Sequence, residues 1–106
     1  MTRQEVPERL LADIKNYLNI TWDDEATDDK LRGLIASGAM YLDSKYGEAA
    51  DYTADGSPRT LLMEYVRYAN DNALSDFEKN YMSLILMMQL ERQVAAHAGE
   101  AEGTGV

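Results

Sequence analysis

Apolar side chains recur at helical spacing in four segments of the chain, which predicts four α-helices. We expect these helices over residues 7–19, 27–46, 58–71 and 75–98. The predicted fold is all-α, a small bundle of about four helices with a long C-terminal helix and a long loop between the second and third. Residues 1–98 then form a single helical domain, and 99–106, which begin at Gly99, form a flexible C-terminal tail.

Local signals at the helix ends support this division. Small polar residues and proline favour helix starts, and glycine favours helix ends. We therefore expect Gly47 to close the second helix, and Gly38, inside its apolar stripe, to mark the close approach of another backbone. The expected starts are Pro7 as a first helical residue, Thr27 as an N-cap, Ser57 as an N-cap before Pro58, and Ser75 with Glu78 as a capping box.

The last predicted helix carries apolar residues on two faces rather than one. A surface helix needs a single apolar stripe, so two stripes predict burial on both sides. Either this helix is central and covered within the monomer, or its second stripe is an exposed interface. We expect the interface, because one small core cannot hide this much apolar helix. The inward face is predicted to hold Phe77, Tyr81, Leu84, Ile85, Met88 and Ala95, and the interface Met82, Leu86, Met87, Leu90 and Val94.

Composition narrows the class of protein. The 106 residues include 19 acids and 10 bases, a formal net charge of −9, and no cysteine. An acidic chain lacks the cations that neutralise phosphates, so we expect weak or no binding to duplex DNA at physiological salt. The first residues carry charges throughout and no apolar run approaches the length of a membrane span, so we expect a soluble intracellular protein without membrane contact.

Candidate chemistry is sparse. An acidic connector, Asp23, Asp24, Glu25, Asp28 and Asp29, precedes and opens the second helix. Its register does not match a calcium loop, so a solvated charge run that starts a helix is preferred to a metal site. His97 is the only histidine, and its place near the end of the last helix suits the helix dipole better than catalysis. We expect no catalytic residue, cofactor or metal. An enzyme would require the acidic connector to form a pocket with His97.

The order of segments resembles the small head–tail connector (head-completion, adaptor) proteins of tailed bacteriophages. The resemblance covers roughly residues 10–92 and rests on helices and apolar spacings. The first half resembles the family through DIKNYLNI, WDDEATDDKLRGLIASGAMYL and a loop after Gly47. The second half, PRTLLMEYVRYANDNALSDFEKNYMSLI, is similar to the helix pair of members from phages and prophages of Gram-positive bacteria.

The resemblance implies a non-enzymatic virion subunit, made in the bacterial cytoplasm and located at the head–tail junction. Such subunits form a ring below the portal protein, extend the DNA channel after packaging, and provide a docking surface for the stopper or tail. An acidic channel lining, with the acidic connector as its candidate, would let DNA pass without adhering. The alternative is a small helical regulator, of anti-repressor or transcription-factor-partner type, that holds a partner helix on its Met-rich stripe.

Overall fold

The computed structural model of the chain describes residues 1–104, with side chains through residue 96. A short 3₁₀ turn, η1 (Arg3–Glu5), precedes α1 (Glu8–Tyr17), α2 (Glu25–Tyr46), α3 (Ser57–Asn70) and α4 (Leu74–Thr104). No strand occurs within residues 1–104. The prediction of a small all-α bundle is confirmed.

The three N-terminal α-helices begin and end within two residues of the predicted limits, whereas α4 continues to Thr104 instead of ending at residue 98. Gly99 disfavours helix by about 1 kcal/mol relative to Ala. The alanines before Gly99 and the alanine and two glutamates that follow it are strong helix formers that offset this cost. Residues 105–106 of the predicted tail lie outside the described part of the chain.

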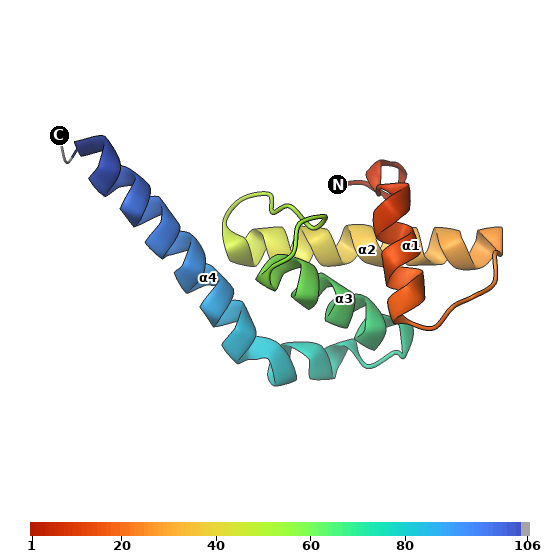
Figure 1. The fold of residues 1–106 in the computed structure, drawn as a ribbon. Helices are drawn as coiled ribbons and strands as arrows, with labels where there is room; N and C mark the ends of the chain where they lie inside the picture. Colours follow the sequence, from red (N-terminus) through yellow and green to blue (C-terminus); the bar gives the residue numbers. More distant parts are fainter. Residues whose placement is uncertain (105–106) are drawn as a thin grey trace.

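The helices surround one core. Figure 1 shows α3 beside α2, α1 running across α2, and α4 passing along α3 before it extends past the loop end of α2. The overall dimensions, 56 × 28 × 20 Å, reflect this extension. All four α-helices contribute to this core, together with Val6 before α1 and Tyr52 between α2 and α3. Its largest fully buried side chains are Leu10, Ile14, Leu31, Ile35, Leu42, Leu61, Leu62, Val66, Phe77, Ile85 and Met88.

Gly38 lets α3 approach α2 closely. A Cβ built at this position would lie 2.6 Å from Cδ1 of Tyr65 and 2.8 Å from Cδ1 of Leu62. Both distances are too short for carbon atoms, so no larger residue fits without a shift. The close approach predicted here therefore exists, but the atoms that meet Gly38 belong to α3 side chains and not to another backbone.

Several predicted helix starts are wrong by one to three residues. Asp24, not Thr27, is the N-cap of α2, and its carboxylate accepts from the Thr27 amide at 3.0 Å. Gly56 precedes α3, so Ser57 is the first helical residue. Pro7 is the N-cap residue of α1. Gly47 ends α2 in the left-handed conformation, at φ 95°, as predicted.

The start of α4 also differs from the prediction. The helix begins at Leu74, so Ser75 lies inside its first turn and is not the N-cap. Glu78 does not reach back to Ser75. Its Oε1 lies 3.7 Å from the Nζ of Lys45 on α2. The carboxylate that would have completed a capping box instead joins α4 to its neighbouring helix.

The connection from α2 to α3, residues 47–56, is anchored to the body by Tyr52. This side chain is 2% exposed, and its hydroxyl donates to Asp43 Oδ1 at 2.6 Å. The Ala50 amide donates to the same oxygen at 3.0 Å, and Arg59 donates to the Tyr52 carbonyl at 3.0 Å. Contacts within the subunit therefore hold the segment that joins the second and third helices. The sequence pattern showed no stripe here because Tyr52 is its one fully buried side chain and hydrogen bonds supply the other contacts.

Candidate interaction surface

The second stripe of α4 is exposed. We call Met82, Leu86, Met87, Leu90 and Val94 the α4 apolar face, and their exposed fractions are 41%, 51%, 53%, 58% and 67%. At 100° per residue they span about 140° of the helix circumference. Large exposed apolar patches usually mark interaction surfaces. Of the two alternatives posed by the sequence, the structure shows the uncovered face.

The inward face of α4 is narrower than predicted. Phe77, Ile85 and Met88 are at most 2% exposed and enter the core between α2 and α3. Leu84, expected beside them, is 38% exposed, and Ala95 is also exposed. Leu84 lies at the edge of the contact with α3, while Ala95 lies beyond the end of α2. The buried face therefore stops at Met88, and the helix continues past the core.

Polar contacts hold the next turn of α4 against the loop end of α2. The Gln89 side chain donates to the Lys45 carbonyl at 2.8 Å. Arg92 forms an ion pair with Glu48 at 3.3 Å and lies over the Tyr46 ring, 5.8 Å from its centroid. From Gln93 through Ala96, every side chain is exposed. The C-terminal part of α4 thus presents its surface to solvent, as the extended end of the helix in Figure 1 shows.

A buried carboxylate fixes the other end of α4. Glu64 on α3 is 7% exposed and accepts from the hydroxyls of Tyr17 on α1 and Tyr81 on α4, the latter at 2.6 Å. Arg67 completes the set with Nε 3.1 Å from Glu64 Oε2. Three helices therefore meet at one carboxylate whose partners are all donors. The arrangement makes Glu64 a structural hydrogen-bond acceptor shared by the three helices.

The pKa shifts around Glu64 agree with this assignment. Hydrogen bonding to Glu64 raises the pKa of Tyr81, and burial of the hydroxyl adds to the effect. Hydrogen bonding to Glu64 also raises the pKa of Arg67. Both donors therefore stay protonated. The sequence analysis missed this cluster, although a Glu between the inward residues Leu61 and Tyr65 was the signal that could have revealed it.

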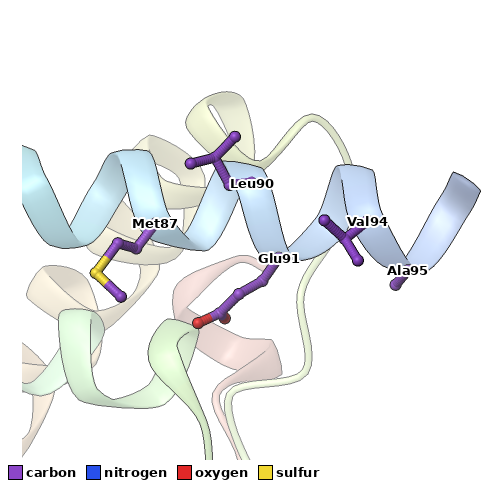
Figure 2. Close-up of a pocket in the computed structure, with 5 residues that line it drawn as sticks. All are labelled: Met87, Leu90, Glu91, Val94 and Ala95. Carbon is purple, nitrogen blue, oxygen red and sulfur yellow. The ribbon is translucent and has the colours of Figure 1, made fainter.

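A shallow hollow lies along the C-terminal half of the α4 apolar face. It measures about 440 Å³ and is lined by Met87, Leu90, Glu91, Val94 and Ala95. Figure 2 shows Leu90 at one edge of the helix and Met87 and Glu91 at the other. The Glu91 carboxylate accepts from the Ser57 hydroxyl at 3.1 Å, so it is held on the side of α3. The hollow is thus apolar apart from one carboxylate at its rim.

The acidic connector is largely used in structural contacts. Lys15, 8% exposed, pairs with Asp23 at 3.0 Å and Asp28 at 2.9 Å, and its pKa is raised, chiefly by the hydrogen bond to Asp28. Asp24 caps α2, and hydrogen bonding to Thr27 lowers its pKa. The remaining members are Asp29, paired with Arg3 at 3.0 Å, and Glu25, exposed in the first turn of α2.

The structure also bears on a metal site, on a catalytic site at His97 and on a membrane-spanning helix. Within the described residues, no three His, Cys, Asp or Glu side chains are grouped as metal ligands. The side chain of His97 lies outside the described part of the chain, so the structure does not place it beside any acid. Among the described helices, none combines the length and apolar character needed to cross a bilayer. The α4 apolar face is therefore the main surface on which a function can be argued.

No protein-family model matches the chain. No curated protein and no solved structure matches it either.

Proposed function

We propose that this protein is a structural assembly subunit, a head–tail connector of a tailed bacteriophage, that joins its neighbours in a ring below the portal protein. The observation that carries the proposal is the α4 apolar face, five large side chains between 41% and 67% exposed on the longest helix. A folded domain that leaves such a face open is suited to binding another protein surface.

The family resemblance of residues 10–92 supplies the identity of the assembly. It implies a ring of copies, with the portal protein on one side and the stopper or tail on the other. The chain's net charge of −9 suits a channel through which DNA slides without being held. Asp24 caps α2, Asp28 is part-buried against Lys15, and Asp29 pairs with Arg3. Exposed Glu25 and Asp23, whose side chain is 99% exposed although it pairs with Lys15, are the better candidates within the acidic connector for a channel surface.

The regulator alternative uses the same face differently. The hollow lined by Met87, Leu90 and Val94 could receive an apolar helix of a partner, as Met-rich surfaces do in adaptable binding proteins. Such a partner would be a single helix and not a ring. Genes encoding portal and capsid proteins beside this one favour the connector, whereas a regulator operon favours the alternative.

Electron microscopy of the purified protein mixed with the neighbouring portal protein tests the proposal. We expect added density in a ring on the portal. The Leu86→Glu variant should lose this density, because a charge at the centre of an apolar contact is desolvated without a partner. Met40→Glu is the matched control, since Met40 is 70% exposed and belongs to α2 and not to the α4 apolar face. A portal that remains bare with the wild-type protein contradicts the connector function.

A further inference from the structure

Four of the five residues of the α4 apolar face, all except Met87, have a regular spacing that is its own complement when reversed. Met82, Leu86, Leu90 and Val94 follow one another at intervals of four residues. Reversing the helix about position 88 exchanges Met82 with Val94 and Leu86 with Leu90. An interface between two identical surfaces needs this property, because each residue pairs with its counterpart across a two-fold axis.

Rows of side chains four residues apart also form the ridges that interlock when helices cross. Two such ridges pack at about −50°, the commonest crossing angle between helices in globular proteins. The crossing point lies opposite Met88, which is fully buried on the other side of α4. Residues two positions from Met88 are turned about 200° away from it, so Leu86 and Leu90 lie at the centre of the exposed side.

Charge further restricts what can cover this face. Residues 80–90 contain no charged side chain in a chain of net charge −9. The next two residues are charged, but Glu91 is held by Ser57 and Arg92 by Glu48. Two copies of an acidic protein repel each other over most of their surfaces. They can approach most closely through a charge-free face. The same face on the second copy also supplies the apolar surface that would cover it.

We infer that in the free protein the α4 apolar face is covered by the same face of a second copy, in a crossed antiparallel pair of α4 helices related by a two-fold axis. The inference rests on the proposed function in taking this face as the assembly surface. It adds that the free subunit is a dimer, which must open before the face engages a ring neighbour or the portal. Since the pairing buries Leu86 against Leu90 of the second copy, it sequesters the face until assembly.

The absence of cysteine from the chain allows a direct test. Leu86→Cys and Leu90→Cys variants are made separately and then mixed, so that some pairs carry one of each. In the inferred pair, position 86 of one copy faces position 90 of the other within disulfide reach. In pairs of identical variants, the two thiols are out of register by four helical positions, about 6 Å.

We expect the mixture to form disulfide-linked dimers several-fold faster than either variant alone, without portal present. Met40→Cys, on the exposed surface of α2, is the control and should not cross-link. Faster cross-linking within each single variant would indicate parallel pairing and overturn the inference. Equal, slow cross-linking in all samples would overturn it as well.

Sedimentation of the wild-type protein gives the second measurement. A dimer that dissociates on dilution, and a Leu86→Glu variant that stays monomeric and helical, are expected. A monomer at all concentrations, or a larger ring without portal, contradicts the two-fold pair. Portal binding is scored separately: a dimer that never binds portal overturns the connector function alone, and a portal-binding monomer overturns this inference alone.

Discussion

The hydroxyl of Tyr81 on α4 donates to the buried carboxylate of Glu64 on α3 at 2.6 Å. This hydrogen bond fixes the N-terminal part of α4, two helical turns after its first residue, Leu74, against α3. Removing the hydroxyl in Tyr81→Phe should lower the free energy of unfolding by about 1.5 kcal/mol, because a hydrogen bond to a charged group is lost. Chemical denaturation measures the change. Tyr68→Phe is the control, since the Tyr68 hydroxyl accepts from exposed Asn80, and it should have less than about 0.5 kcal/mol of effect.

The anchor of the 47–56 segment predicts a local change in dynamics. Tyr52→Phe keeps the buried ring but deprives Asp43 of a donor, and we expect a loss of about 1 kcal/mol. Tyr52→Ala should cost about 3–5 kcal/mol, because it also empties the space filled by the ring. Hydrogen exchange should show faster amides across the segment in both variants, more so in the second. Unchanged exchange in Tyr52→Ala would show that the segment is held by other contacts.

Two glycines of α2 should respond to alanine in opposite directions. Gly38→Ala is expected to destabilise by about 1–3 kcal/mol, because the added methyl meets the packed Tyr65 and Leu62 side chains. At Gly33 the nearest atom is Nη2 of Arg3, the end of a half-exposed side chain that can move aside. Gly33→Ala should therefore stabilise by up to about 1 kcal/mol through helix propensity. Thermal melts of both variants show whether each substitution raises or lowers the stability of the protein.

The contrast between the two sides of α4 is also testable. Ile85 is 2% exposed, so Ile85→Glu should cost several kcal/mol and unfold the isolated subunit. Leu86 is 51% exposed, and Leu86→Glu should leave the subunit helical and cooperatively folded. Circular dichroism and thermal melts separate the two variants. If Leu86→Glu unfolded the monomer as Ile85→Glu does, the face would belong to the core of the subunit.

Asp24, the N-cap of α2, should make the stability of the protein depend on pH. Hydrogen bonding to Thr27 lowers the pKa of Asp24 in the folded state. The unfolded chain therefore binds a proton more readily, so this stabilisation is present above about pH 4 and is lost as the pH falls through the lower, folded-state value. Asp24→Asn keeps a capping side chain that does not titrate. Its stability should match wild type near neutral pH and decline less below about pH 4.

The fold could be predicted from the sequence to a large extent. Apolar periodicity identified four helices, and the double stripe of α4 identified the face that the structure leaves exposed. Helix starts were less accurate, because several capping residues compete in the same few positions. Thr27 and Asp24 are both good N-caps, and in the structure Asp24 takes this position while the Thr27 amide donates to its carboxylate.

The polar anchors could not be predicted in the same way. Glu64 accepts from Tyr17 and Tyr81, which lie 47 and 17 residues away, and Tyr52 donates to Asp43, nine residues away. No periodic pattern records such a contact. The limits of the inward face of α4 were missed for a related reason. Leu84 and Ala95 both fit the helical spacing, but Leu84 lies at the edge of the contact with α3, and Ala95 lies beyond Met88, the last buried residue of α4.

The last described ion pair between α4 and the body is that of Arg92, and twelve helical residues follow it, from Gln93 to Thr104. At 1.5 Å per residue they form a rod about 18 Å long. A tilt of α4 by roughly 10° about its contacts at Gln89 and Arg92 would move the tip of this rod by about 3 Å. Only a few polar contacts, those of Gln89 and Arg92, are described at this end of the contact between α4 and the rest of the subunit. A small adjustment there, when a neighbour binds, is therefore magnified into a displacement large enough to change what the far end of the helix can reach.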